Sequence, residues 1–217
     1  SFCTRSFLKN HISHTSGRVL EVGTGISSLL QDLPTFERYG IDISEKTITT
    51  VDALFKNKNI PAVFIVADAQ RIPLPTAFFD VIVSAHTLEH IENDAAVMQE
   101  CARLLKPGGE LLFFVPGRID GTATPEEWHS LGHYRSYNLR RFKDLEAATS
   151  GALSLSLIRY PHKIHNLLWN RLKHGFRWVN YPLKKWVFRD NKTYEERSGY
   201  THWILPAIAT TLDMLDS

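Results

Sequence analysis

The sequence predicts an α/β fold in which helices cover a Rossmann-like, doubly wound and mostly parallel sheet. Short apolar runs alternate with segments of helical periodicity between residues 17 and 160. Several of these runs are apolar throughout, which is typical of strands buried on both faces. A glycine turn, Gly23-Thr-Gly25, follows the first run and precedes a predicted helix. Such a turn lets free backbone N–H groups approach a bound nucleotide.

Runs of Val, Ile, Leu and Phe that end at glycine or acidic residues identify the strands. The first run is bounded by Gly17 and Gly23. The predicted strands are residues 18–22, 36–43, 62–66, 78–84, 110–116 and 152–160.

Caps and periodicity identify the helices. Ser44 and Asn138 are expected N-caps, because a side-chain oxygen there can accept a hydrogen bond from a free helix N–H. Lys106-Pro-Gly-Gly109 is expected to end one helix and to form a turn. The predicted helices are residues 2–13, 26–33, 45–58, 93–105 and 139–148.

Length and composition fit a single domain that buries most of its apolar surface. The 217 residues are 43% hydrophobic, and no apolar run reaches the roughly 18 residues that a membrane-spanning helix needs. Two cysteines, Cys3 and Cys101, do not make a disulfide framework, so we expect a reducing, cytoplasmic location. The chain opens at Ser1 rather than Met, which leaves N-terminal processing or targeting open.

Acidic residues stand at or near the ends of three successive predicted strands. They are Glu21, Asp42 and Asp68. The carboxyl ends of the strands line the ligand crevice of an open parallel sheet, so we expect these three side chains to converge there. A carboxylate after the second strand can accept hydrogen bonds from both hydroxyls of a ribose, and one after the third can meet the amino group of an adenine. A carboxylate at the first strand end can orient the loop or meet a cationic group.

Five motifs together resemble those of class I S-adenosylmethionine-dependent methyltransferases. They occur in the order of that family over roughly residues 17–116. The motifs are Val19-Leu-Glu-Val-Gly-Thr-Gly25, Gly40-Ile-Asp-Ile-Ser44, Ala67-Asp-Ala69, Phe79-Asp-Val-Ile-Val-Ser-Ala-His-Thr-Leu-Glu-His-Ile91 and Leu104-Leu-Lys-Pro-Gly-Gly-Glu-Leu111.

The resemblance implies that S-adenosylmethionine is the cofactor and that residues 1–160 form the part that binds it. Glu21 and the glycine turn would hold the methionine end, Asp42 the ribose, and Asp68 the adenine. Ser27 and Ser28 stand where many members have a further glycine, which would narrow the turn slightly. The expected cofactor-binding residues are Glu21, Val22, Gly23, Thr24, Gly25, Asp42, Ile43, Asp68, Ala69, Ala85 and His86.

A second, looser resemblance concerns Gly132-His-Tyr-Arg-Ser-Tyr137. A similar Gly-His-x-Arg-x-Tyr stretch is found in a subgroup of methyltransferases that act on small molecules. His133, Arg135 and Tyr137 alternate, so they share one side of an extended segment. They could bind and deprotonate an acceptor, or they could fasten this loop to the sheet. The candidate catalytic residues are His133 and His86, and the candidate substrate-binding residues are Trp128, Arg135 and Tyr137.

The expected reaction is methyl transfer to an oxygen, nitrogen or carboxylate of a small metabolite or a lipid- or sugar-linked acceptor. An NAD-dependent oxidoreductase is a weaker alternative, because its fingerprint needs glycine at the position of Ser28. His86-Thr-Leu-Glu-His90 has the His-x-x-Glu-His pattern of a zinc hydrolase, but it follows a buried strand, and we expect no metal. A non-catalytic module that binds an adenosyl cofactor is the remaining alternative.

The C-terminal part is unusually basic, although the formal net charge of the chain is only +2. Residues 147–189 contain eight Lys or Arg, no Asp or Glu, and several interleaved aromatic residues. We expect residues 161–217 to form a helical extension or lid of the same domain. Peripheral contact with a membrane is an alternative, and no recognised nucleic-acid-binding module is present. No seventh strand is evident after Tyr160, so we expect the family's final strand to be missing or its sheet to be incomplete.

Overall fold

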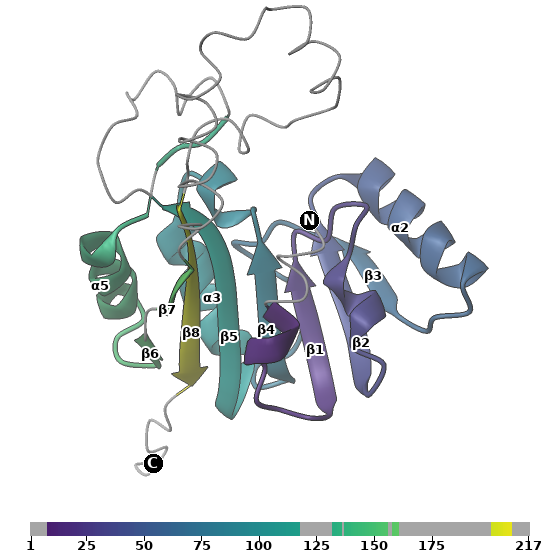
Figure 1. Ribbon diagram of the computed structural model, residues 1–217, viewed down its shortest axis with the longest axis horizontal. Coiled ribbons are helices and arrows are strands. Elements are labelled where there is room, and N and C mark those ends of the chain that lie inside the picture. Colours follow the sequence, from purple (N-terminus) through teal and green to yellow (C-terminus); the bar gives the residue numbers. More distant parts are fainter. Residues whose placement is uncertain (1–7, 118–131, 136, 156–157, 161–200, 210–217) are drawn as a thin grey trace, which may run out of the picture.

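The computed structural model describes residues 8–117, 132–135, 137–155, 158–160 and 201–209. A single sheet lies at the centre of these residues, with the strand order β3-β2-β1-β4-β5-β8-β6, and β7 pairs with β8 (Figure 1). The strands are β1 (Gly17–Val22), β2 (Phe36–Asp42), β3 (Val63–Val66), β4 (Phe79–Ala85), β5 (Leu105–Gly117), β6 (Leu153–Leu155), β7 (Ile158–Tyr160) and β8 (Thr201–Ala209). The helices are η1 (Leu29–Asp32), α2 (Glu45–Asn57), η2 (Leu88–His90), α3 (Asp94–Leu104) and α5 (Leu139–Ala148).

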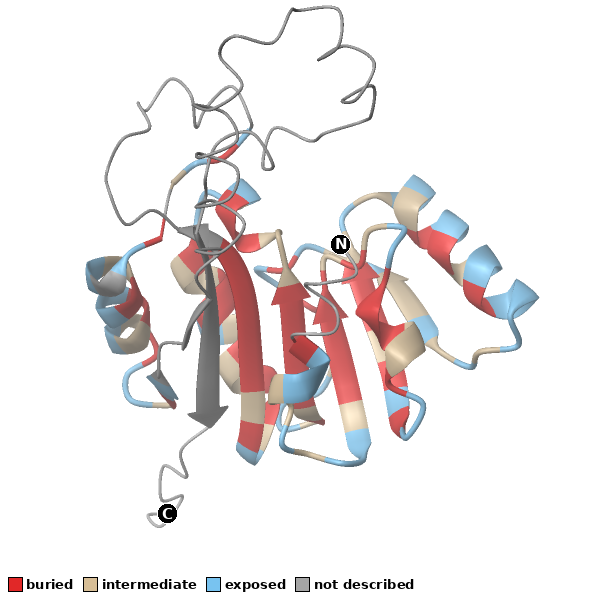
Figure 2. Cartoon of the chain, in the orientation of Figure 1, coloured by how far each residue is buried: buried red, intermediate tan, exposed pale blue. Residues whose placement is uncertain are grey.

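Strands β1 to β5 run parallel, and the chain order reverses direction across the sheet between β1 and β4. This is the doubly wound arrangement that the sequence predicts. Two apolar layers cover the sheet, because side chains on alternate positions of a strand point to opposite faces. One layer packs α3 and α5 against Leu20, Ile82 and Leu111, and the other packs η1 and α2 against Val19 and Val81. The central strands are buried along most of their length (Figure 2).

The predicted caps are confirmed where the structure describes them. Ser44 accepts a hydrogen bond from Thr47 N at the start of α2, and Asn138 accepts one from Arg141 N at the start of α5. Asn93 does the same for α3 through Ala96 N. The leading helix predicted over residues 2–13 is helical at residues 8–11, and its first part lies outside the described residues.

The prediction of an α-helix over residues 26–33 is wrong in the type of helix and in its length. The chain forms only the four-residue 3-10 helix η1, with Ser28 as its N-cap. Leu33 precedes Pro34, and the residue before a proline is disfavoured in the helical region. The turn and the cap therefore leave room for only a single tight turn of helix.

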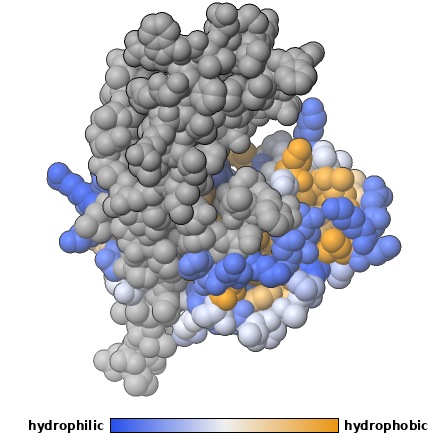
Figure 3. All heavy atoms as spheres, viewed as in Figure 1, coloured by the Kyte–Doolittle hydropathy of each residue, from blue (hydrophilic) through white to orange (hydrophobic). Residues whose placement is uncertain are grey.

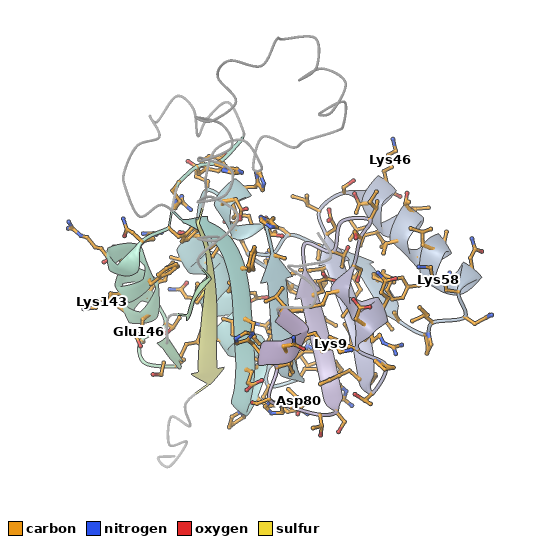
Figure 4. All side chains as sticks on the ribbon, in the orientation of Figure 1. Lys9, Lys46, Lys58, Asp80, Lys143 and Glu146 are labelled. Carbon is orange, nitrogen blue, oxygen red and sulfur yellow. The ribbon has the colours of Figure 1, made fainter. Side chains whose placement is uncertain are left out.

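The predicted turn at residues 106–109 lies inside β5. This strand begins at Leu105, opposite Phe79, and its regular pairing with β4 resumes at Glu110, opposite Val81. The residues between form a bulge, and Gly108 supplies the positive φ of 76° that it needs. Close by, Lys106 Nζ lies 2.8 Å from both carboxylate oxygens of Asp80, at the end of the sheet where Figure 4 labels Asp80.

The expectation that the final strand is missing is wrong. Strand β8 pairs antiparallel with β5 on one side and with β6 and β7 on the other. The predicted sixth strand at residues 152–160 is divided into β6 and β7, which both pair with β8. The helical extension or lid expected over residues 161–217 is wrong at residues 201–209, which form β8. Residues 161–200 and 210–217 lie outside the described residues.

At the opposite edge of the sheet, β3 has a partner on one side only. Val63 and Val66 of this strand are exposed, and so are Leu54 of α2 and Ile43 beyond β2. Figure 3 shows apolar surface on the side of the molecule where α2 and β3 lie. Among the described residues, no helix combines the length and the apolar character that crossing a membrane demands.

Candidate active site

A cavity of about 680 Å³ lies at the carboxyl ends of β1, β2 and β4. This is the edge where a doubly wound sheet binds ligands, and the volume lies within the range of cofactor sites. Nine of the predicted cofactor-binding residues line it: Gly23, Thr24, Gly25, Asp42, Ile43, Asp68, Ala69, Ala85 and His86. The other lining residues were not among those predicted to bind the cofactor. They are Ile26, Ser27, Ile41, Ala67, Gln70, Thr87, His90, Ile91, Glu92 and Tyr134.

The glycine turn brings backbone to the floor of this cavity. Gly23 N and Thr24 N both donate to Ile41 O, at 2.9 and 3.0 Å, which joins the ends of β1 and β2. Gly23 has a φ of 75°, and a Cβ atom at this position would lie 2.1 Å from Thr87 Oγ1. Only glycine fits here, because the site combines a left-handed backbone with a close approach.

Glu21 holds the loop that follows the glycine turn by hydrogen bonds and does not line the cavity. Val22 does not line it either. The Glu21 carboxylate is buried and accepts hydrogen bonds from Ser28 Oγ and from Leu29 N, the latter at 3.0 and 3.1 Å. Ser28 Oγ also accepts a hydrogen bond from Leu30 N. The serine that departs from the family pattern therefore fastens the glycine loop to β1. Of the two roles that the sequence left open for Glu21, the structure supports orientation of the loop.

Asp42 stands at the end of β2 with its carboxylate at the cavity wall. Its Oδ2 accepts a hydrogen bond from Gly25 N at 3.2 Å, and its Oδ1 accepts one from Ser44 N at 3.0 Å. Each carboxylate oxygen has a second lone pair, so both can still accept a hydroxyl from a ligand. The two backbone bonds fix the carboxylate in one orientation.

Two apolar residues line the cavity close to Asp68. They are Ile43, which follows β2 and is 75% exposed, and Ala69, which follows β3. Asp68 is exposed, and its Oδ1 accepts a hydrogen bond from Gln70 N at 2.9 Å. Apolar surface beside a carboxylate acceptor suits an aromatic base that carries an amino group.

His86 enters the cavity from the end of β4 in an unusual backbone conformation. Its φ of 55° is rare for a residue other than glycine, and His86 N donates to Phe114 O at 3.0 Å. The His86 ring packs edge-on against Phe114, and its Nδ1 lies 3.5 Å from Glu89 Oε1. Strain of this kind is held by surrounding structure and is frequent at functional sites.

The segment around residues 132–137 fastens itself to the backbone of residues 88–92. Tyr134 N donates to Glu89 O at 2.8 Å, and His90 Nδ1 lies 3.0 Å from Gly132 O. Arg135 donates to Ile91 O and to Glu92 O. Tyr137 Oη donates to Leu88 O at 3.1 Å.

Asp94 anchors the other end of this segment. Its carboxylate is fully buried at the start of α3 and contacts Arg135, Tyr137 and Arg141. Burial is the main cause that raises the pKa of the Tyr137 hydroxyl, and the charge of Asp94 raises it further. Asp94 was not among the predicted site residues, although an acidic residue in the first turn of a helix is a recognised structural signal.

These contacts correct the roles expected for Arg135 and Tyr137. Both side chains hold the loop and do not line the cavity, so the fastening interpretation is supported over the acceptor-binding one. His133 is also buried and does not line the cavity, whereas His86 does. Tyr134, one of the intervening residues of the motif, lines the cavity instead. Trp128 lies outside the described residues.

The structure does not support the zinc-hydrolase alternative in which His86, Glu89 and His90 form the site. His86 and His90 do not share an α-helix, because His86 has a left-handed backbone and Leu88–His90 is a short 3-10 helix. Within the described part of the chain, the group that could hold a metal ion is Glu89, His90 and His133, without His86.

The comparisons with known proteins agree with the fold. Residues 20–113 match the family model of a methyltransferase domain. The chain is 34% identical over 104 residues to a probable S-adenosylmethionine-dependent methyltransferase of Mycolicibacterium smegmatis, which covers 46% of the chain and 38% of the relative. It is 29% identical over 110 residues to a ubiquinone biosynthesis O-methyltransferase of Nitrosococcus oceani, covering 49% of the chain and 47% of the relative.

Solved structures show the same fold at low sequence identity. Phosphoethanolamine N-methyltransferase 2 of Haemonchus contortus superposes with a TM-score of 0.71 at 18% identity, over 97% of this chain and 53% of that one. The [4+2]-cyclase SpnF superposes with a TM-score of 0.73 at 17% identity, over 96% of this chain and 81% of that one. The fold is of the doubly wound α/β class, which binds nucleotide cofactors at the carboxyl ends of its strands. The family match covers residues 20–113, and with this fold it supports a class I S-adenosylmethionine-dependent methyltransferase domain in that part of the chain.

Proposed function

We propose that the protein transfers the methyl group of S-adenosylmethionine to an oxygen, nitrogen or carboxylate of a small or lipid- or sugar-linked acceptor. The observation that carries this proposal is the cavity itself. Gly23 and Gly25, Asp42 and Asp68 meet there at the ends of three neighbouring strands, and His86 forms the facing wall. The chain spans less than half of the length of the two relatives described above, so the acceptor has to come from experiment.

The residues present fit the adenosyl cofactor. Asp42 would accept the two ribose hydroxyls, because its carboxylate is already oriented by Gly25 N and Ser44 N. Asp68 would accept the adenine amino group while Ile43 covers one face of the base. No Cβ-sized obstacle lies within 4 Å at Gly25, so the backbone there is open to the methionine end.

Bound S-adenosylmethionine supplies an activated methyl group on a sulfonium. The nucleophile forms a bond to the methyl carbon while the carbon–sulfur bond breaks, and the sulfur leaves as a neutral thioether. The protein therefore has to align the acceptor and keep water out, and needs a base only for an acceptor that carries a proton. We assign the acceptor end of the cavity to His86, His90 and Tyr134, and we assign His86 rather than His133 as the group that contacts the acceptor.

We also propose that residues 161–200 act as a lid over the acceptor. Their mixture of cations and aromatic side chains suits closure over an acceptor or contact with a membrane surface. Either arrangement would help to exclude water from the site.

Calorimetry with S-adenosylmethionine tests the cofactor assignment. Asp42→Ala is expected to weaken binding by about 1–3 kcal/mol, because a charge-assisted pair of hydrogen bonds is lost. Asp52→Ala is the matched control, since Asp52 lies on α2, the helix that follows Asp42, and forms an ion pair with Lys56 on the surface of that helix. Equal affinities in wild type and Asp42→Ala would remove the ribose assignment, and no binding at all in wild type would remove the proposed function.

A further inference from the structure

We propose that Glu89, His90 and His133 form a binding site for a divalent transition-metal ion at the edge of the cofactor cavity. One possible ligand atom from each residue lies within 4.8 Å of the other two. Two imidazole nitrogens and one carboxylate oxygen are the donor set of many catalytic zinc sites. The same set disfavours calcium and magnesium, which prefer oxygen ligands.

The environment of Glu89 supports a bound cation. Its side chain is 1% exposed, and neither carboxylate oxygen has a hydrogen-bond partner among the described residues. His86 Nδ1 lies 3.5 Å from Glu89 Oε1. A buried carboxylate without hydrogen bonds is costly unless a positive charge compensates it. A metal ion between Glu89 and the two histidines supplies that charge.

The orientation of His90 also favours metal binding. Its Nδ1 lies 3.0 Å from Gly132 O, and a carbonyl can only accept, so Nδ1 carries the proton. The lone pair is then on Nε2, which is the tautomer that a metal ligand requires. A backbone carbonyl that fixes a histidine in this way is the usual partner of a metal-bound imidazole.

The three residues are held together by the fold. Glu89 and His90 belong to η2, and His133 comes from the segment that fastens to it through Tyr134 N and Glu89 O. The His90 and His133 rings lie edge to face with centroids 4.7 Å apart. Ligands of a tetrahedral zinc ion lie about 3.3 Å apart, given bond lengths near 2.0 Å. Metal binding would therefore draw the three ligand atoms closer together than the 4.8 Å within which they lie.

Three protein ligands leave at least one coordination position open. His90 also lines the part of the cavity that the proposed function assigns to the acceptor, so an acceptor bound there would lie beside the ion. The ion would take an oxygen atom of that acceptor and hold it beside the methyl donor. This last step depends on the proposed function, whereas the metal site itself does not.

The test uses the full chain, freed of metal with a chelator and titrated with Co²⁺ and with Zn²⁺. We expect one ion per chain and the visible absorption of Co²⁺ bound in a site of low symmetry. Glu89→Gln and His133→Ala should each lower affinity at least about tenfold, because loss of a mere supporting residue already costs that much. Glu92→Gln and His11→Ala are the matched controls, since Glu92 also lines the cavity and His11 is distant in sequence.

Thermal melting shows whether each variant is folded, and S-adenosylmethionine binding is measured on the same samples. Absence of Co²⁺ and Zn²⁺ binding in wild type would overturn the site. Equal loss, or no loss, in Glu89→Gln and Glu92→Gln would overturn it too. A chain that binds Co²⁺ through these residues but does not bind S-adenosylmethionine would support the site and refute the proposed function.

Discussion

Tyr137 Oη donates to the buried carboxylate of Asp94 at 3.1 Å, although the two residues are 43 positions apart. Leu88 O lies at the same distance of 3.1 Å from this hydroxyl, so its single proton is shared between the two acceptors, and the phenol joins the start of α3 to η2. The Gly-His-x-Arg-x-Tyr motif therefore acts on the cavity indirectly. It sets the position of η2 and of the residues that follow β4.

Tyr137→Phe should lower the free energy of unfolding by about 1–2 kcal/mol, because a buried hydrogen bond is lost. Asp94 keeps its two arginine partners, so the protein should still fold. Denaturant unfolding measures the change, and Tyr134→Phe is the control, since Tyr134 is 50% exposed. Equal losses in the two variants would contradict a special role for the Tyr137 hydroxyl.

Gly23→Ala should destabilise the protein more than Gly108→Ala does. The φ values are 75° and 76°, so both variants incur the left-handed penalty of about 1–2 kcal/mol. Only at Gly23 would the new Cβ collide with Thr87, and overpacking adds about 1–3 kcal/mol. Unfolding midpoints measure the difference, and indistinguishable midpoints would show that Thr87 moves away at no cost.

Ser28→Ala should lower stability by about 1–3 kcal/mol and also weaken S-adenosylmethionine binding. The substitution removes a donor to the buried Glu21 carboxylate and the cap of η1. Ser154→Ala, on an exposed position of β6, should change neither quantity. If Ser28→Ala kept full affinity for the cofactor, the loop would not depend on its link to β1.

The buried thiol of Cys101 should lower the free energy of unfolding at alkaline pH. Burial raises the pKa of its thiol well above the ordinary value of 9.0. The unfolded chain therefore releases this proton above about pH 9 while the folded chain keeps it, and stability falls by up to about 1.4 kcal/mol per pH unit. Cys101→Ala lacks this effect.

The stability advantage of wild type over Cys101→Ala should thus be constant below about pH 8 and should shrink between pH 9 and 10. Chemical denaturation at a series of pH values measures it. Parallel curves for the two proteins across this range would mean that the thiol ionises as readily in the folded chain as in the unfolded one.

The sequence predicts the parallel half of the sheet well because its strands are short apolar runs with acidic or glycine ends. Strand β8 escaped prediction for a physical reason. It contains Pro206, which pairs opposite Leu112, and a proline inside a strand normally argues against a central position. In addition, β8 pairs with β5 across a long stretch of chain, and pairing at that distance leaves no local pattern in the sequence.

In the candidate site, too, features with a local sequence pattern were predicted and features that depend on tertiary structure were not. The positions of Asp42 and Asp68 follow from strand ends, and the structure places both at the cavity. The side of the segment at residues 132–137 that faces the cavity could not be predicted, because alternation separates two faces without saying which one is buried. Glu21 was correctly located at its strand end, but its hydrogen bonds to Ser28 and Leu29 depend on the tertiary path of the loop.

Strand β8 follows β6 in the chain but lies between β5 and β6 in the sheet. During synthesis, β5 and β6 therefore emerge from the ribosome before β8, and the edges that pair with β8 stay unpaired until β8 has been made. Unpaired edges of this kind attract other chains. A nascent chain that is stalled before Thr201 should consequently need protection by chaperones. A chain that extends beyond Ala209 contains β8 and can pair it with both β5 and β6.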